Sequence, residues 1–390
     1  MDSINRLKIL QSGIKNPILI KKKENLFYLT GRSFDYRAEE YLLVKPTIAE
    51  KRQKSTDMVV GFGSGLENMD WIKKSDRLKN IGQYVKGYKE LGIEWGFSYG
   101  EGEYLKFKIP NSKFKIKPEL SPVDEMRQVK EPEELDKIRK SMQIVEKVFG
   151  LVRKKLIYSE KRRKITEIEL AQFITSQGFK MGAEDVSFPA IVASGANAAI
   201  PHHVPSKKVL KAGESIIIDF GFKYKNYCSD FTRTVFLKKA PKNLEIAYNQ
   251  VEKAYNGSME FVDSSLRVRP KQSLKKIRLP RPSDAFGARN DRGLYAGKVY
   301  QKAVDILAEK KLDKYFIHSL GHGTGLEIHE LPNLSPKSKD VLKDGMVFSI
   351  EPGVYIPKVG GIRIEDLLYL ENSKIKKFIS IPTQIKENIL

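Results

Sequence analysis

Four acidic residues lie within segments whose other residues are typical of buried β-strands. Asp219 follows three isoleucines, Asp230 precedes an aromatic and β-branched run, Glu351 follows an apolar strand, and Glu365 alternates with isoleucines. A carboxylate in such a setting costs free energy unless it is paired or binds a cation. Four surface acids on half-buried strands would explain each position alone but explain the group poorly. The sequence therefore favours acids that share bound cations.

Histidine is scarce in this chain and is confined to two groups. The sequence contains five histidines, namely His202 and His203, then His318, His322 and His329. Any one of them could instead be a structural histidine in the core, with its ring nitrogens hydrogen-bonded. Clustering of so few histidines instead indicates metal or proton chemistry.

The acids and one histidine together form a plausible ligand set for two divalent cations. The five candidate ligands are Asp219, Asp230, His322, Glu351 and Glu365. Oxygen donors with one imidazole suit Mn²⁺, Co²⁺, Fe²⁺ or Zn²⁺, and the lack of thiolate argues against a structural zinc site. Strand alternation places Arg363 on the same face as Glu365. We expect it to hydrogen-bond the ligating carboxylates, in preference to forming a surface ion pair.

The order of apolar patterns predicts two domains. Residues 1–120 are expected to form a small α/β domain, in which 24–31 would be a strand. Residues 121–390 are expected to form an α+β domain, with a helix near Pro132, a second helix from Thr166 to Gly178, and then an antiparallel sheet. Thr166 and Glu169 have the spacing of a capping box. A basic insertion is expected at about 263–295, and we favour a solvated loop over an anion contact there.

The chain is strongly basic, with a formal net charge of +22. Lysines spread over the whole chain favour a solvated surface over specific nucleic-acid binding. One cysteine, Cys228, excludes an internal disulfide and suits a reducing compartment. The first residues lack the apolar core of a signal peptide, and no long apolar run predicts a membrane span. We therefore expect a cytoplasmic protein without membrane contact.

The five candidate ligands occur in an order and in surroundings that resemble a known family. FIHSLGHGTGLEIHELP, FSIEPGVYI and GIRIED around them are similar to the pita-bread metallopeptidases, and within these to the Xaa-Pro aminopeptidases and prolidases. The resemblance covers about Val123 to Leu370. It implies a C-terminal pita-bread domain over 121–390, an antiparallel sheet covered by helices, and a smaller creatinase-like α/β domain over 1–120.

The resemblance also implies a cofactor and an assembly. Two divalent metal ions per chain are expected, with Mn²⁺ first and Co²⁺, Fe²⁺ or Zn²⁺ as alternatives, in a homodimer. Asp219 would bind one ion, His322 and Glu351 the other, and Asp230 and Glu365 would bridge the two.

Further residues acquire catalytic roles through the same resemblance. His202 and His329 match histidines that contact the substrate in the transition state, and His318 matches one that lines a proline pocket. Glu351 would carry a proton to the leaving nitrogen, with Arg363 in support. His203 matches no role.

The implied activity is release of the first residue from peptides with proline at the second position. HELPNLSP after His329 favours this over the alternative, an Xaa-Pro dipeptidase (prolidase). A non-catalytic pita-bread protein that binds nucleic acid would account for the net charge, and a creatinase would use no metal. The complete ligand set speaks against both of these.

Overall fold

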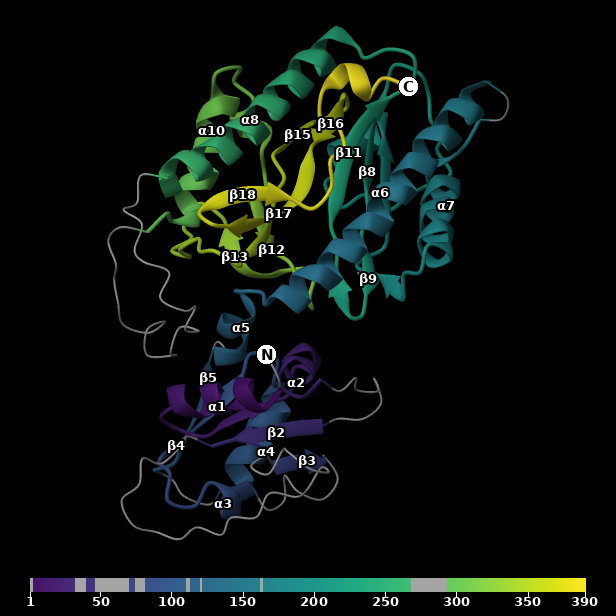
Figure 1. The fold of residues 1–390 in the computed structure, drawn as a ribbon. Helices are drawn as coiled ribbons and strands as arrows, with labels where there is room; N and C mark the ends of the chain where they lie inside the picture. Colours follow the sequence, from purple (N-terminus) through teal and green to yellow (C-terminus); the bar gives the residue numbers. More distant parts are fainter. Residues whose placement is uncertain are drawn as a thin grey trace. The chain divides into compact units, whose positions relative to one another are not determined.

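The computed structural model describes residues 3–31, 40–45, 70–73, 81–109, 113–119, 121–161, 164–267 and 293–390 (Figure 1). The chain divides into two compact units, one within Met1–Arg127 and one formed by Gln128–Gln272 and Asp291–Leu390. The helix α5 (Pro122–Arg127) belongs to the first unit, because Asp124 and Arg127 form hydrogen bonds with Asn25. Most of the predicted insertion at about 263–295 lies outside the described residues.

The first unit is built on a five-stranded mixed sheet in the order β3-β2-β1-β4-β5. The strand β1 pairs antiparallel with β2 and parallel with β4, and buried Leu19, Leu43 and Leu91 contribute to one apolar cluster on this sheet. In chain order, the elements of the unit before α5 are α1 (Ser3–Gly13), β1 (Ile18–Ile20), α2 (Lys23–Thr30), β2 (Glu40–Val44), β3 (Asp70–Lys73), α3 (Ile81–Tyr84), β4 (Glu90–Glu94), α4 (Tyr99–Lys108) and β5 (Lys115–Glu119).

One predicted strand of this unit is wrong. Residues expected as a strand over 24–31 form most of the helix α2, which ends at Thr30 and is capped by Gly31 with a left-handed φ of 70°. Leu26, Leu29 and Thr30 are buried at helical spacing. A short apolar run satisfies strand and helix periodicity almost equally, and here the glycine C-cap accompanies the helix.

The second unit is built on an eight-stranded antiparallel sheet. Seven strands follow the order β13-β12-β14-β17-β11-β8-β7, and β18 pairs with β17. Its strands are β7 (Ile191–Ser194), β8 (Ser215–Asp219), β11 (Phe231–Phe236), β12 (Gly321–Gly323), β13 (Glu330–Leu334), β14 (Val347–Ile350), β17 (Glu365–Glu371) and β18 (Lys374–Lys377). The smaller sheets comprise β6 (Asp185–Val186), β9 (Phe222–Tyr224) and β10 (Tyr227–Cys228), and the hairpin of β15 (Gly353–Ile356) and β16 (Gly360–Arg363).

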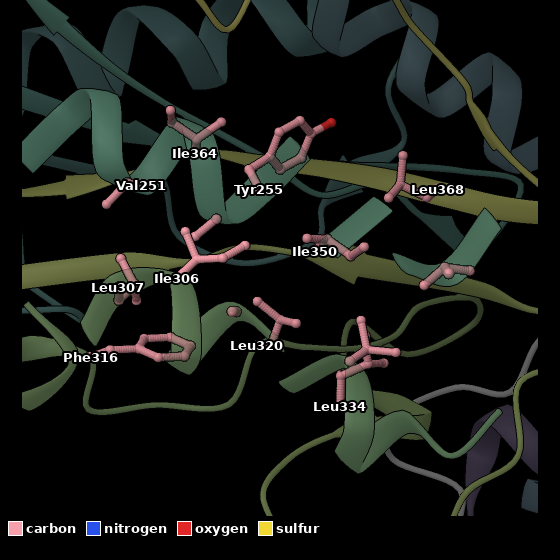
Figure 2. Close-up of a cluster of buried hydrophobic side chains, with 14 of the residues drawn as sticks. Val251, Tyr255, Ile306, Leu307, Phe316, Leu320, Leu334, Ile350, Ile364 and Leu368 are labelled. Carbon is pink, nitrogen blue, oxygen red and sulfur yellow. The ribbon is translucent and has the colours of Figure 1, made fainter. Parts of the chain in front are cut away.

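Four long helices surround this sheet (Figure 1). They are α6 (Pro132–Lys161), α7 (Glu167–Lys180), α8 (Lys242–Arg267) and α10 (Ala296–Ala308). Short 3-10 helices also occur: η2 (Gly195–Ala199) between β7 and β8, η3 (Asp313–Tyr315) between α10 and β12, and η4 (Ile385–Glu387) after β18. Figure 2 shows Tyr255 of α8 and Ile306 of α10 among side chains of the sheet such as Leu368. Each large apolar side chain buried in this way contributes about 1.5–3 kcal/mol. In the part of the chain that the structure describes, no helix combines the length and apolarity needed to cross a membrane.

The helix α7 begins as its sequence predicts but ends later. Thr166 is the N-cap and forms a complete capping box with Glu169. The predicted end at Gly178 is wrong, because the helix continues to Lys180. Gly178 instead allows a close approach: a Cβ there would lie 1.9 Å from the ring of Phe222.

A buried arginine joins the centre of the sheet to the C-terminal segment. Arg233 in β11 is fully buried and donates hydrogen bonds to Asp366 Oδ1 at 2.7 Å and to the carbonyl oxygen of Glu365 at 2.7 Å. It also donates to the carbonyl oxygens of Ile381 and Pro382. These hydrogen bonds hold β17 in place at Asp366, the residue next to Glu365.

Candidate metal centre

The five predicted ligands lie on five neighbouring strands in the middle of the large sheet. Their positions, following the strand order β12-β14-β17-β11-β8, are His322 within β12, Glu351 directly after β14, Glu365 at the start of β17, Asp230 directly before β11, and Asp219 at the end of β8. In the register of the sheet, Thr232 pairs with Asp219 on one side and with Glu365 on the other. Pairing of distant strands therefore brings the acids to one place.

The ligand atoms of three residues are close enough to share one ion. Those of Asp230, His322 and Glu365 lie within 4.8 Å of one another, and all three residues are buried. His322 Nε2 is 3.4 Å from Asp230 Oδ2 and 3.4 Å from Glu351 Oε1. The other ring nitrogen, Nδ1, lies 3.1 Å from the Gly323 carbonyl oxygen. A proton on Nδ1 leaves the Nε2 lone pair facing the carboxylates, as coordination requires.

Burial and mutual repulsion make the charged form of these carboxylates unfavourable without a cation. Burial, followed by the charges of the neighbouring acids, raises the pKa of Asp230 and of Glu365 well above the ordinary value. Burial raises the pKa of Glu351 to about 8 and lowers the pKa of His322 to about 3. Such opposite shifts in one cluster are typical of functional sites.

The donor set fits divalent metal ions. Asp219 Oδ1 and Glu365 Oε1 are buried and have no hydrogen-bond partner among the described residues. A buried carboxylate oxygen without a donor is expensive, and a cation would satisfy it. Carboxylate oxygens with one imidazole nitrogen suit Mn²⁺, Fe²⁺, Co²⁺ or Zn²⁺.

Arg363 links the acids to an aromatic side chain that the sequence did not single out. Its Nη2 donates to Asp219 Oδ2 at 2.5 Å, its Nη1 donates to the Tyr355 hydroxyl at 2.7 Å, and its Nε donates to Thr232 Oγ1 at 3.3 Å. Thr232 Oγ1 in turn donates to Glu365 Oε2 at 2.7 Å. Nothing in the sequence distinguished Tyr355 from a core aromatic residue, because its partner Arg363 lies across the β15–β16 hairpin.

The polar network continues to His318. Its Nδ1 lies 2.7 Å from the Ser319 carbonyl oxygen and its Nε2 lies 2.9 Å from the Tyr355 hydroxyl. Burial, followed by the charge of Arg363, lowers the pKa of His318 to about 4, so the ring is neutral at pH 7. Nδ1 then donates to the carbonyl, and Nε2 accepts from Tyr355. The ring of Phe316 meets His318 edge-on, with centroids 5.1 Å apart.

The remaining histidines lie at the outer side of the cluster. His329 is exposed, and its ring meets that of His322 at a centroid distance of 4.2 Å. His202 is also exposed, and its charge acts on Asp219, His318 and His329. His203, for which the sequence offered no role, instead contacts Glu167 with Nε2 at 2.9 Å from Oε2. Cys228 is buried, as expected for a small core residue.

Comparison with known proteins identifies relatives over most of the chain. The model of metallopeptidase family M24 matches residues 136–272 and 285–372, and the interval between these blocks falls within the predicted insertion. A putative Xaa-Pro aminopeptidase of Mycoplasma pneumoniae is 33% identical, with 94% of this chain and 93% of the relative covered. An Xaa-Pro dipeptidase of Pyrococcus horikoshii is 31% identical, with 97% of each covered.

Solved structures agree with the fold. The prolidase of Pyrococcus horikoshii superposes with a TM-score of 0.75 at 27% identity, covering 98% of this chain and 99% of that one. An X-Pro aminopeptidase of Thermotoga maritima gives a TM-score of 0.72 at 25% identity over 98% and 99%. The predicted pita-bread fold and the resemblance on which it was based are confirmed.

Proposed function

The chain belongs to metallopeptidase family M24, and from this premise we propose that it releases the N-terminal residue from peptides with proline at the second position. The observation that supports this most directly is the convergence of the five predicted ligands from five neighbouring strands. Two of their buried carboxylate oxygens, Asp219 Oδ1 and Glu365 Oε1, find no donor in the part of the chain that the structure describes. We propose a dinuclear centre, with Mn²⁺ as the first candidate. Divalent ions held there would supply Lewis acidity for the peptide carbonyl and an activated water.

Proline at the second position suits such a centre. The bond before proline is a tertiary amide without an N–H, so a peptidase that must hydrogen-bond that group is handicapped. Glu351 is the proposed carrier of a proton to the leaving nitrogen. It is half-buried, whereas the other four predicted ligands are buried. His318, whose ring meets those of Phe316 and Tyr355 edge-on, is the proposed contact for the proline ring.

Substrate length separates the two activities named among the relatives. We expect higher kcat/KM on Xaa-Pro peptides longer than a dipeptide than on matched Xaa-Pro dipeptides, because the segment after His329 favours the aminopeptidase pattern. Hydrolysis of a matched peptide pair by the metal-loaded protein measures this. A kcat/KM about tenfold higher on the dipeptide would make the protein a prolidase. Faster cleavage of Met-Ala peptides would remove the proline preference altogether.

The outer histidines provide a second test. His202→Ala and His329→Ala should each lower kcat by on the order of 10²–10³-fold, because their proposed contacts strengthen only in the transition state. Metal content should stay that of the natural protein, since neither residue is a proposed ligand. Metal analysis and steady-state kinetics on the same preparations check both points. If a folded variant loses its ions, the role proposed for that residue is wrong.

The oligomeric state, the compartment and the partners are also proposals. The expected assembly is a homodimer in the cytoplasm, acting on peptides without specific nucleic-acid or membrane partners. Mass measurement in solution tests the assembly.

A further inference from the structure

A buried carboxylate gathers the segment that carries His202. Glu167, the first residue of α7, is fully buried. Six donor groups converge on its two oxygens: Ser194 N and Oγ, Asn197 Nδ2, His203 Nε2, and Ser206 N and Oγ, at 2.7 to 3.1 Å. All six belong to residues 194–206, which we call the His202 segment. The backbone adds a further tie, because Ile168 N donates to the Ser206 carbonyl oxygen at 3.0 Å.

The other side of the His202 segment rests on β16. Arg363 Nη1 donates to the carbonyl oxygen of Pro201, the residue before His202, at 3.3 Å. Gly361 approaches the carbonyl oxygen of Ala198 so closely that a Cβ would lie 1.9 Å from it. The segment is therefore held between the carboxylate of Glu167 and the arginine that also binds Asp219.

His202 itself makes no hydrogen bond with another described residue. His202 is exposed and interacts electrostatically with Asp219, His318 and His329, and its position depends on how its neighbours are held. The flanking contacts are those of Pro201 with Arg363 and of His203 with Glu167.

We propose that Glu167 is a positioning residue for the reaction: through His203 and the hydroxyl and backbone donors of the His202 segment, it fixes the His202 ring at the metal centre. This inference rests on the proposed function, in which His202 contacts the substrate. Burial alone would raise the pKa of Glu167, but the hydrogen bonds from Ser206, His203, Ser194 and Asn197 outweigh it and hold the pKa at about 2. The acceptor is therefore ionised at neutral pH.

Glu167→Gln is a sharp test because it keeps the shape of the side chain but replaces one acceptor oxygen by an NH₂ group, which is a donor. Oε1 accepts from Ser194 N and Oε2 accepts from Ser206 N. Whichever oxygen becomes an NH₂ group then faces a backbone N–H that cannot accept. The His202 segment must shift, and a misplacement of about 1 Å can cost on the order of 10²-fold in rate.

We expect Glu167→Gln to lower kcat by this order while metal content stays unchanged. In the His202→Ala background the same substitution should have little further effect, because the group that it positions is already absent. Hydrogen exchange of the Ser194 and Ser206 amides should become faster in the variant. His203→Ala should lower kcat less than Glu167→Gln, and His203→Gln should restore part of it by returning a donor near the place of Nε2.

The matched control is Glu94→Gln in the first unit. Glu94 is also buried and accepts two backbone N–H groups, those of Lys21 and Lys22, with Asn25 and Ser121 on its other oxygen. It should cost stability without changing kcat. If Glu167→Gln does not fold, the comparison of His203→Ala with His203→Gln carries the test.

The outcomes separate the inference from the proposed function. Losses that multiply in the Glu167→Gln, His202→Ala double variant would overturn the positioning role while leaving the peptidase assignment intact. A His202→Ala variant with the kcat of the natural protein would overturn the proposed role of His202 and the inference with it. Absence of cleavage of any Xaa-Pro peptide by the metal-loaded natural protein would overturn the proposed function.

Discussion

Replacing Asp230 by asparagine is expected to abolish both metal binding and peptide hydrolysis. The amide has one oxygen where the proposed bridging carboxylate would use two, and it supplies no charge to the proposed metal centre. Loss of the Lewis acid should lower kcat/KM by at least about 10³-fold, since that contribution is worth several kcal/mol. Metal analysis after gel filtration and hydrolysis of an Xaa-Pro peptide measure the two effects. Full activity of a chelated, metal-free preparation would end the metallopeptidase mechanism.

The same substitution should not lower the stability of the metal-free protein. Asp230 lies among Asp219, Glu351 and Glu365, and their charges raise one another's pKa. Removing one carboxylate relieves this repulsion, so metal-free Asp230→Asn should be at least as stable as the metal-free natural protein. Mn²⁺ at 100 times its Kd should stabilise only the natural protein, by about 2.7 kcal/mol for each bound ion. Asp305→Asn, on an exposed face of α10, is the control and should keep both ions.

The candidate ligands were predictable because each acid interrupts an apolar strand. Asp219 and Glu365 could be recognised locally, since a carboxylate among isoleucines needs a counter-charge wherever the strand lies. The capping box of Thr166 and Glu169 was local in the same way, and the structure contains it. The roles assigned to His202, His318 and His329 stay predictions, and the variants above test those of His202 and His329.

Other parts of the site were not predictable, because they depend on contacts that only the folded chain brings together. Tyr355 gains its meaning only through Arg363 and His318, and Glu167 only through donors 27 to 39 residues away. Glu167 alone looks like an ordinary acid in the first turn of a helix. The helix α2 was mistaken for a strand because its apolar run is too short for periodicity to decide.

Replacing Arg233 by methionine is expected to destabilise the second unit by about 3–5 kcal/mol, because it leaves Asp366 buried without its main counter-charge. The arginine is fully buried, Asp366 is 1% exposed, and Nη2 lies 2.7 Å from Oδ1. Tyr255 and Lys377 also contact Asp366 Oδ2, but Lys377 is partly exposed and compensates less. Denaturant unfolding of the metal-free protein, followed separately by metal affinity, measures the effect.

Two further variants show whether the lost charge pair is the cause. Arg139→Met removes a partly exposed arginine whose partner Asp136 is exposed, and such pairs contribute about 0–1 kcal/mol. Asp366→Asn added to Arg233→Met should recover part of the stability, because no uncompensated charge then remains buried. No recovery would mean that Arg233 stabilises the fold mainly through the carbonyl oxygens of Glu365, Ile381 and Pro382. Since Glu365 is the residue beside Asp366, we also expect weaker metal binding in Arg233→Met: the strand that carries this proposed ligand would have lost the side chain that holds it in register.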